Sequence, residues 1–209
     1  MILYSYGLSS ASYRVRIALA LKGIAHDTVT LNLRLGEHHM ADYREVNAQG
    51  FVPALQLDGG GLLNQSLAII EYLDEIYPQP ALLPADALGR ARVRALCQLI
   101  CSDVHPLDNL RVLRYLELTL KLDAAAREAW YRHWIEQGFA ALERLLQVSP
   151  GARYSHGDAV TLADLCLVPQ VFNARRFAVN VEPYPRIVAV DAACRELPAF
   201  RDTAPQLQS

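Results

Sequence analysis

The chain has 209 residues, of which 52% are hydrophobic and 20% charged, and its formal net charge is −2. This composition supports a packed core in one large or two small domains and excludes a disordered chain. Because the charge is almost balanced, the chain has no general attraction to nucleic acid or to an anionic membrane, and we expect neither as a partner.

The sequence lacks the patterns typical of membrane insertion, secretion and metal binding. No stretch reaches the ~20 uncharged apolar residues that a membrane-spanning helix needs, and the opening MILYSYG lacks the basic segment and apolar core of a signal peptide. The cysteines form no CxxC pair, and no His or Cys neighbour completes a set of metal ligands. We therefore expect a cytoplasmic protein without a metal site. Its four cysteines, which we expect to be reduced, are Cys97, Cys101, Cys166 and Cys194.

Strand and helix patterns alternate near the start of the chain. Residues 1–6 (MILYSY) predict a buried strand, and residues 12–23 (SYRVRIALALKG) predict a helix that ends at Gly23. Residues 26–33 (HDTVTLNL) alternate between polar and apolar side chains, with Val29 among the apolar ones on one face, and predict a second strand. Two strands separated by a helix favour a parallel pair joined by a crossover.

A hairpin pattern and another helix follow. Residues 52–66 (VPALQLDGGGLLNQS) predict two short antiparallel strands joined by a Gly-rich turn, and residues 66–78 (SLAIIEYLDEIYP) predict an amphipathic helix stopped by Pro78. The expected order is a β-α-β unit, a connecting helix or loop, and then a β-β-α unit, which is the thioredoxin-like arrangement. We therefore expect an α/β domain over residues 1–80.

A proline-rich stretch at residues 78–86 (PQPALLPAD) predicts a linker between two domains. Beyond it, the pattern is helical almost throughout. The expected fold is thus a thioredoxin-like α/β domain followed by an all-α domain over residues 88–209.

Within the helical part, three stretches carry the clearest patterns. Residues 89–116 predict a helix pair or one helix kinked around Pro106, and residues 127–146 predict a strongly amphipathic helix. Another helix is expected over residues 161–177, where Thr161 precedes an apolar run and Asp164 follows three residues later. This spacing is typical of a capping box, in which the two residues satisfy backbone N–H groups at the start of a helix.

Two adjacent serines, Ser9 and Ser10, lie at the junction between the first predicted strand and the first predicted helix. A helix N-terminus presents unpaired N–H groups and about half a positive charge, so it favours an anion such as a thiolate or carboxylate. The serine hydroxyls can donate to the same anion. The alternative interpretation is that one serine only caps the helix.

Two further segments have features that suit a ligand. In Val52–Pro53, a proline directly before a strand fits a cis bond that presents neighbouring backbone groups. Gln65–Ser66 opens a second helix, where an amide and a hydroxyl suit a second carboxylate. Taken singly, Pro53 has a structural explanation and Ser66 a capping one.

Five segments together resemble one family. The strings SSASYRVRIALALKG, VPAL, NQSLAIIEYLDE, HPLDNLRVL and NARRF are similar to those of zeta-class glutathione transferases, and the resemblance runs through almost the whole chain. It implies the glutathione transferase fold, which agrees with the two domains expected from the patterns above. It also implies glutathione as a cofactor and a homodimer as the assembly.

In this resemblance, Ser9 matches the serine that activates the glutathione thiol, with Ser10 beside it. The other glutathione contacts that it implies in the first domain are His38, Val52, Pro53, Gln65 and Ser66. The backbone of Val52 would pair with the cysteinyl part, and Gln65 and Ser66 would bind the γ-glutamyl end. For His38, the alternative is an exposed loop histidine.

In the helical domain, the resemblance implies that His105 and Asn109 close the glutathione site. Arg176 matches an arginine that pairs with a substrate carboxylate, and a guanidinium can hold a carboxylate through two hydrogen bonds. Arg111 would supply a second cation to the substrate. The alternatives are a helix-kink residue for His105 and a surface arginine for Arg111.

Two positions differ from the usual pattern of the class. Cysteine often follows the paired serines, and this chain has Ala11 there; arginine often precedes them, and this chain has Leu8. The chain therefore lacks that cysteine and that cation near the expected thiol.

The resemblance implies a glutathione-dependent cis–trans isomerase that converts a maleyl β-keto acid, maleylacetoacetate, to its fumaryl isomer in aromatic amino acid catabolism. Its substrate would be a small dicarboxylate. Three alternatives stay open: maleylpyruvate as the substrate, conjugation of electrophiles by a glutathione transferase, and a binding module that keeps the fold without chemistry. The intact set Ser9, Pro53, Gln65 and Ser66 argues against the binding module, because a scaffold needs none of these residues.

Overall fold

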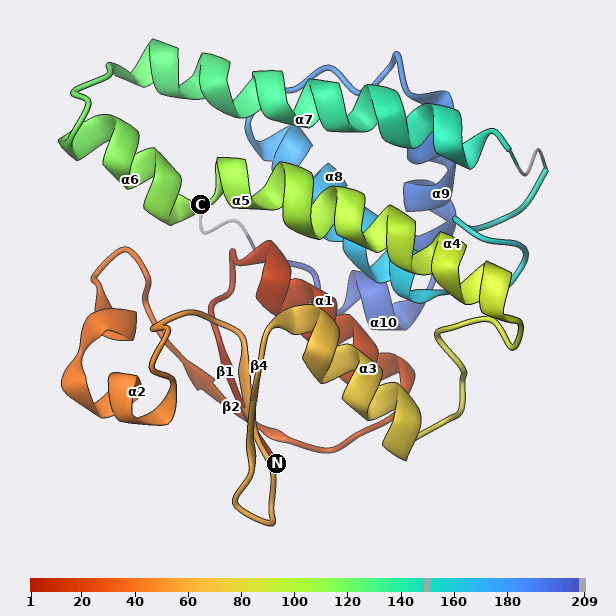
Figure 1. The fold of residues 1–209 in the computed structure, drawn as a ribbon, viewed down its shortest axis with the longest axis horizontal. Coiled ribbons are helices and arrows are strands. Elements are labelled where there is room, and N and C mark those ends of the chain that lie inside the picture. The colour runs from red at the N-terminus through yellow and green to blue at the C-terminus, as the bar shows by residue number, and fades with distance from the viewer. Residues whose placement is uncertain (149–150, 207–209) are drawn as a thin grey trace. The chain divides into compact units, whose positions relative to one another are not determined.

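The computed structural model describes residues 1–148 and 151–206, and the chain divides into two compact units (Figure 1). The first unit comprises Met1–Ala81 with Leu197–Ser209, and the second comprises Leu82–Glu196. The predicted end of the helical domain at residue 209 is therefore corrected. The segment 197–206 belongs with the first unit because it buries Phe200 there and α10 (Pro198–Arg201) packs against α1 (Ser10–Leu21).

The first unit is built on a four-stranded mixed sheet in the order β2-β1-β3-β4. Its strands are β1 (Ile2–Ser5), β2 (Asp27–Thr30), β3 (Ala54–Gln56) and β4 (Leu62–Asn64). The pair β1–β2 is parallel, whereas β1–β3 and β3–β4 are antiparallel. This topology confirms the crossover and the hairpin expected from the sequence, and with them the thioredoxin-like arrangement.

Strand β2 differs from its prediction in length and burial. The alternating pattern ran to residue 33, but the strand ends at Thr30 and all four of its residues are exposed. Val29 is 39% exposed. The reason is position: β2 is an edge strand that pairs only with β1, so alternation alone overestimated how much of it the core would cover.

Helices cover both faces of this sheet. Figure 1 shows α1 side by side with α3 (Ser66–Ile76) on one face and the short α2 (Ala41–Val46), which follows the 3-10 turn Glu37–His39, on the other. Helix α1 ends as expected: its cap, Lys22, precedes Gly23 at φ +62°, a left-handed conformation that glycine adopts readily. The Lys22 ammonium then donates to Asp74 at 2.8 Å and to the carbonyls of Tyr77 and Pro80.

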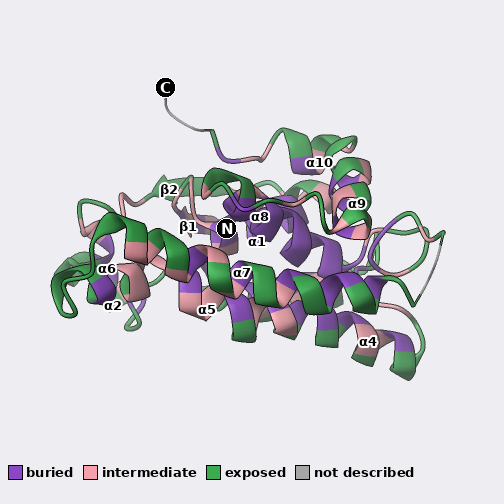
Figure 2. Cartoon of the chain, turned by 90° about the horizontal axis from the view of Figure 1, so that it is seen from above, coloured by how far each residue is buried: buried purple, intermediate pink, exposed green. Residues whose placement is uncertain are grey.

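In the part of the second unit that the structure describes, every regular element is helical. They are α4 (Ala87–Gln98), a π-helical segment (Leu99–Val104), α5 (His105–Asp108), α6 (Leu110–Leu118), α7 (Ala124–Leu146), α8 (Leu162–Arg176) and α9 (Pro185–Arg195). Helix α8 packs against α4 and α9 and is buried along most of its length (Figure 2). It is therefore the core of this unit.

The capping box at the start of α8 is present. The Asp164 carboxylate, fully buried, accepts from the Thr161 N–H at 2.7 Å and from the Ser155 N–H at 2.8 Å. It also accepts from the Thr161 hydroxyl at 3.0 Å. These bonds fix the loop before α8 and the entry of the chain into its central helix.

The kink expected around Pro106 takes the form of a π-helical segment followed by the single turn of α5, with Pro106 at its first positions. Helix α7 approaches this segment at Gly138, where an added Cβ would lie 2.1 Å from a methyl carbon of Val104. Only glycine permits so close an approach.

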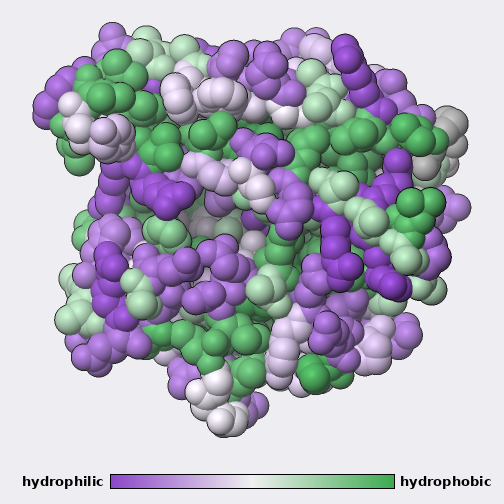
Figure 3. All heavy atoms as spheres, in the orientation of Figure 1, coloured by the Kyte–Doolittle hydropathy of each residue, from purple (hydrophilic) through white to green (hydrophobic). Residues whose placement is uncertain are grey.

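Hydrophilic and hydrophobic residues are interspersed over the face of the molecule drawn in Figure 3. Among residues 1–148 and 151–206, no helix is both long and apolar enough to span a bilayer. The same residues contain no group of three or more His, Cys, Asp or Glu side chains arranged to hold a metal ion. None of the four cysteines is in a disulfide.

Candidate active site

The strand register brings the predicted glutathione residues of the first unit to one end of the sheet. Tyr4 pairs with Ala54, Ala54 pairs with Asn64, and Ser5 pairs with Thr30. The chain therefore leaves β1, β2 and β4, and enters β3, at the same end. The segments attached there carry Ser9, Ser10, His38, Val52, Pro53, Gln65 and Ser66.

Ser9 is the N-cap of α1 and is partly exposed. Its hydroxyl oxygen accepts from the Ser12 N–H at 3.2 Å. A hydroxyl has one hydrogen and two lone pairs, so this bond leaves the hydrogen available to donate. Ser10, by contrast, is 3% exposed. Ser9 is therefore the cap that the alternative interpretation expected, and its hydroxyl hydrogen is not used in that cap.

Gln65 and Ser66 form the start of α3. Gln65 is the N-cap, with φ +67° and ψ 116°, a strained conformation for a residue other than glycine. Its amide nitrogen donates to the side chain of Gln49 at 3.0 Å. Ser66 is the first helical residue rather than the cap, so the capping explanation offered for it is wrong.

A buried cation lies behind Ser66. The Arg14 side chain of α1 is 2% exposed, and its guanidinium donates to the Ser66 hydroxyl at 3.2 Å. This contact joins the second turn of α1 to the first residue of α3. The sequence analysis did not identify Arg14, although a signal was available: it lies four residues from both Ser10 and Ala18, which are buried on the same helix face.

The Val52–Pro53 bond is cis, as the sequence suggested, and both residues are buried. The carbonyl of Phe51, just before it, is held by two donors. The Tyr43 hydroxyl lies at 2.6 Å and the Asn47 amide at 2.9 Å. Burial raises the pKa of Tyr43 to about 12, so its hydroxyl keeps its proton at neutral pH and remains a donor. Neither side chain was expected from the sequence to support this segment.

His38 is 6% exposed, so the alternative of an exposed loop histidine is wrong. Its ring lies 3.8 Å, centroid to centroid, from the ring of His39. Gly50, at φ +61°, passes so close that an added Cβ would lie 2.7 Å from the His38 carbonyl oxygen. The glycine thus lets the segment before Val52 pack against the turn that carries His38.

The predicted residues of the helical unit lie on three helices. His105 opens α5 and is partly buried, and Asn109 is the N-cap of α6, with its side chain accepting from the Val112 N–H at 3.2 Å. Arg111 is exposed on α6. Asn109 therefore has a structural role as a cap, and its amide hydrogens, which the cap does not use, are left to donate to a ligand.

The two neighbouring arginines at the end of α8 differ in their surroundings. Arg175 forms an ion pair at 2.5 Å with Asp191 of α9, whose side chain is 2% exposed. Arg176 is exposed, and its guanidinium lies 5.0 Å from the ring centre of Phe177. Among residues 1–148 and 151–206, Arg176 has no carboxylate partner, so its charge is available to a ligand.

The first unit has the donors that an anionic peptide requires. The N-termini of α1 and α3 lie at the same end of the sheet, and each concentrates unpaired N–H groups and partial positive charge. Ser9 adds a hydroxyl donor to one terminus, and Ser66 with Arg14 adds a hydroxyl and a buried cation to the other. A thiolate suits the first terminus and a carboxylate the second, and glutathione has both groups.

Comparison with known proteins gives consistent matches. The family model described as the N-terminal domain of glutathione S-transferase matches residues 8–76. The chain is 53% identical to the maleylpyruvate isomerase of Ralstonia sp, over 100% of this chain and 98% of that protein.

Two solved structures are similar over the whole chain. One is a holo structure of a maleyl pyruvate isomerase, described as a bacterial glutathione S-transferase of the zeta class. It has a TM-score of 0.96 and 53% identity, and covers 100% of this chain and 98% of that one. The other is a maleylacetoacetate isomerase of Methylobacterium extorquens with bound malonate and glutathione. It has a TM-score of 0.96 and 37% identity, with the same coverage.

Proposed function

The chain belongs to the zeta class of glutathione transferases, and we propose that it is a glutathione-dependent enzyme that isomerises the cis double bond of a maleyl β-keto acid. The observation that carries this proposal is the meeting of Ser9, Val52 and Ser66 at one end of the sheet. The relatives described above are named for the same reaction, and one of them was solved with glutathione bound.

Glutathione is held, in this proposal, by the first unit. The γ-glutamyl carboxylate binds at the start of α3, where Ser66 donates a hydroxyl hydrogen and Arg14 adds positive charge behind it. Gln65 contributes its side chain at the same place, and its strained backbone supports a functional role. The backbone of Val52 pairs with the cysteinyl part, and His38 is a further contact.

The thiol is activated at the start of α1. The hydroxyl hydrogen of Ser9 points to the glutathione sulfur, and the positive end of the helix favours the thiolate over the thiol. Ser10 supports the same turn from its buried position. A lower thiol pKa raises the fraction of nucleophile at neutral pH, although each thiolate is then somewhat less reactive.

The reaction is an addition followed by an elimination. The thiolate forms a bond to one carbon of the cis alkene, and the electron pair of the double bond moves to the neighbouring ketone oxygen as an enolate. The former double bond is then single and rotates. When the enolate collapses, the carbon–sulfur bond breaks, the double bond returns as trans, and the thiolate is released unchanged. Donors aimed at the enolate oxygen would lower the barrier most.

Arg176 is the proposed partner of a substrate carboxylate, with Arg111 as a second cation. Support for Arg176 comes from its lack of a carboxylate partner within the described residues, whereas Arg175 already pairs with Asp191. Malonate, a dicarboxylate, is bound in the related maleylacetoacetate isomerase, which supports the same class of substrate here. His105 and Asn109 are proposed as glutathione contacts from the helical unit.

Two substrates fit this class, maleylacetoacetate and maleylpyruvate. Each has two carboxylates and a cis alkene next to a ketone, and they differ in length. Maleylacetoacetate was expected from the sequence, and the relative at 53% identity is named for maleylpyruvate. Measuring kcat/KM for both compounds decides between them.

The decisive experiment uses purified protein with glutathione held far below the substrate concentration. An isomerase converts all of the substrate because glutathione is regenerated. A conjugating transferase stops when glutathione is exhausted, and a binding module retains glutathione without turnover. Formation of the fumaryl product at substoichiometric glutathione is the expected result, and arrest after one equivalent would overturn the proposal.

We also propose a homodimer located in the cytoplasm. The homodimer rests on the family resemblance, and the cytoplasmic location rests on the cysteine pattern of the chain, which suits a reducing compartment. Sedimentation of the purified protein tests the first and fractionation of the source cells the second.

A further inference from the structure

The chain makes a tight turn just before Ser9. The Ser9 N–H donates to the Tyr6 carbonyl at 3.0 Å, which closes a four-residue turn from Tyr6 to Ser9. Ser9 then caps α1. The direction of the Ser9 hydroxyl therefore depends on how this turn is held.

Arg16, two turns into α1, reaches back to the same turn. Its Nη1 donates to the Tyr6 carbonyl at 3.4 Å and to the Ser5 hydroxyl at 3.1 Å. Its Nη2 donates to the Gly7 carbonyl at 3.1 Å. The Tyr6 carbonyl thus accepts from both Ser9 and Arg16, so the guanidinium and the proposed catalytic serine share one acceptor.

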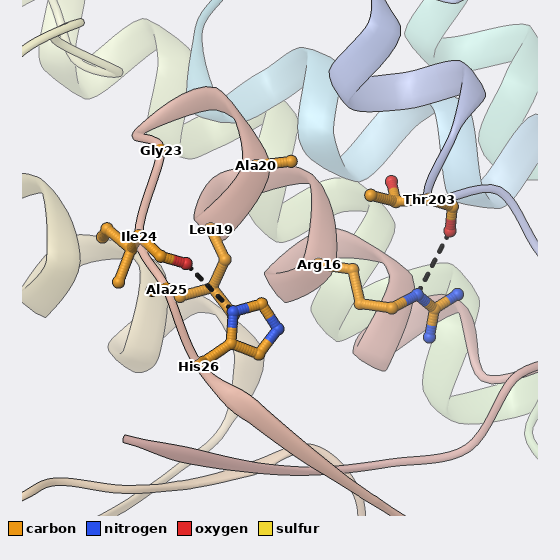
Figure 4. Close-up of a pocket in the computed structure, with 8 residues that line it drawn as sticks. All are labelled: Arg16, Leu19, Ala20, Gly23, Ile24, Ala25, His26 and Thr203. Carbon is orange, nitrogen blue, oxygen red and sulfur yellow. Dashed lines mark hydrogen bonds between the residues drawn. The ribbon is translucent and has the colours of Figure 1, made fainter.

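The remaining edge of the guanidinium faces the C-terminal segment. The Arg16 Nε donates to the Thr203 carbonyl at 3.1 Å, as Figure 4 shows. The hydroxyl of Tyr13, three residues before Arg16 on α1, donates to the Phe200 carbonyl at 2.6 Å and holds the same segment. Arg16 therefore bridges the turn before Ser9 and residues 187 positions away along the chain.

The chemistry of arginine suits this bridge. Burial lowers the pKa of Arg16 to about 10, so the group stays charged at neutral pH. A guanidinium offers five N–H donors in a rigid plane, and the contacts above engage Nε, Nη1 and Nη2. A lysine ammonium has three donors around one atom and cannot span the same acceptors.

We propose that Arg16 is a positioning residue for the isomerase reaction: it fixes the Tyr6–Ser9 turn against the C-terminal segment and so aims the Ser9 hydroxyl at the glutathione sulfur. This inference rests on the proposed function, in which Ser9 stabilises the thiolate. Arg16 itself has no assigned contact with glutathione, so it acts only through the turn.

A pocket beside Arg16 provides a direct test. It has a volume of about 280 Å³ and is lined by Arg16, the apolar side chains of Leu19, Ala20 and Ile24, and His26 and Thr203. Figure 4 shows the ring of His26, bonded to the Ile24 carbonyl, on the side of the pocket opposite Thr203. If Arg16 is replaced by alanine, this pocket opens onto the vacated position, and guanidinium added to the solution can enter.

The experiment compares Arg16→Ala and Arg16→Lys with the unchanged protein. Three quantities are measured: kcat, KM for glutathione, and the pKa of the bound thiol from the ultraviolet absorbance of the thiolate. We expect kcat to fall about tenfold to a hundredfold in both variants, the scale typical of a misplaced catalytic group. KM for glutathione should change little, and the bound thiol pKa should rise. Guanidinium at concentrations that do not denature the protein should restore kcat in Arg16→Ala.

Tyr13→Phe is the matched control. It removes the bond from Tyr13 to the Phe200 carbonyl but keeps the ring and all contacts of Arg16 with the turn. It should lose stability without a rise in the thiol pKa. If Arg16→Ala does not fold, Arg16→Lys is compared with the unchanged protein instead, because lysine keeps the positive charge but lacks the planar set of guanidinium donors.

The outcomes separate this inference from the proposed function. If the unchanged protein does not lower the pKa of bound glutathione, the proposed role of Ser9 fails. If the unchanged protein lowers the pKa of the bound glutathione thiol and both Arg16 variants lower it equally well, only the positioning role of Arg16 fails. Equal losses of stability, affinity and kcat in Arg16→Ala, with no rescue by guanidinium, would also overturn the positioning role and make Arg16 a structural residue.

Discussion

The Ser9 hydroxyl has two roles, as a hydrogen-bond acceptor in the helix cap and as the proposed donor to the thiolate. Its oxygen caps α1 through the Ser12 N–H, and its hydrogen is proposed to bind the thiolate. A substitution therefore removes a helix cap and a catalytic donor together. Separating the two effects requires two variants that both lack the hydroxyl but differ in how well they cap the helix.

Ser9→Ala should lower kcat by about ten- to a thousandfold, the range typical for loss of one donor to a developing or stabilised anion. KM for glutathione should change much less, because Val52, Gln65 and Ser66 do most of the binding. Ser9→Gly lacks the hydroxyl as well but costs only a few tenths of a kcal/mol as a cap, against ~0.5–2 kcal/mol for alanine. Both variants should lose the same kcat in steady-state assays. A glycine variant with the original kcat would show that capping, rather than the hydroxyl, matters.

Arg175 and Arg176 provide an internal comparison on α8. Arg176→Ala should raise KM for the dicarboxylate and lower kcat/KM by roughly ten- to a hundredfold, since a charged hydrogen bond contributes ~1.5–3 kcal/mol. It should leave activity with a neutral electrophile such as chlorodinitrobenzene unchanged. Stability should also be almost unchanged, because Arg176 has no carboxylate partner within the described residues.

Arg175→Ala should lower stability and leave the preference for dicarboxylate substrates unchanged. It removes the 2.5 Å partner of Asp191, which is 2% exposed, and leaves that carboxylate with Arg195 at 3.8 Å as its one ion-pair partner among the described residues. Urea unfolding should show a loss of about 1–3 kcal/mol. The ratio of activities on dicarboxylate and neutral substrates should stay the same. A selective loss of dicarboxylate activity in Arg175→Ala would move the carboxylate site by one residue.

Some residues of the candidate site followed from the sequence and others did not. Ser9 and Ser66 were found because a hydroxyl at a strand-to-helix junction is a local pattern. Arg14 was missed because its partner Ser66 lies 52 residues away, and the bridging role of Arg16 was missed because Thr203, one of its partners, lies 187 residues away. A charged residue on a buried helix face indicates that a partner exists, but the sequence alone does not say which one.

The capping box before α8 allows a test of one element. Asp164→Asn keeps one oxygen but places an NH₂ group where the carboxylate accepts from a backbone N–H of Ser155 or Thr161. One buried donor is then left without an acceptor, which costs about 1–3 kcal/mol. The free energy of unfolding in urea measures the loss.

Asp158→Asn is the matched control for this test. Asp158 also accepts from a backbone N–H, that of Arg153 at 3.0 Å, but it is exposed. An asparagine oxygen can replace that single contact, so the change should stay within ~0.5 kcal/mol. Equal losses in the two variants would mean that burial of the Asp164 bonds adds nothing.

Elements with strong local signals were predicted well, and those shaped by packing were not. The hairpin, the glycine stop of α1 and the capping box of α8 depend on a few neighbouring residues. The short β2 depends on being an edge strand, and the π-helical segment lies against Gly138 of α7, where Val104 leaves no room for a Cβ. Neither condition is visible in a local window of sequence.

The largest departure from the sequence prediction concerns how the chain is divided. Proline-rich residues 78–86 marked the first boundary, but no comparable signal precedes Leu197, where the chain returns to the first unit. The return is made by long-range contacts: Phe200 is fully buried, and α1 bonds to the carbonyls of Phe200 and Thr203. The first unit is therefore built from both ends of the chain.

This division predicts that a change near the C-terminus weakens glutathione binding. Phe200→Ala removes a fully buried ring from the first unit and should lower its stability by about 3–5 kcal/mol. The two tryptophans, Trp130 and Trp134, both lie on α7 of the second unit, so their fluorescence reports on that unit, whereas bound glutathione reports on the first. In urea, the midpoint for glutathione release should fall at least as far as the midpoint of the fluorescence change. Arg201→Ala, at a residue whose side chain is 60% exposed, should move neither midpoint. If Phe200→Ala lowered only the fluorescence midpoint, the C-terminal segment would stabilise the helical unit instead, and the assignment of residues 197–206 to the first unit would be wrong.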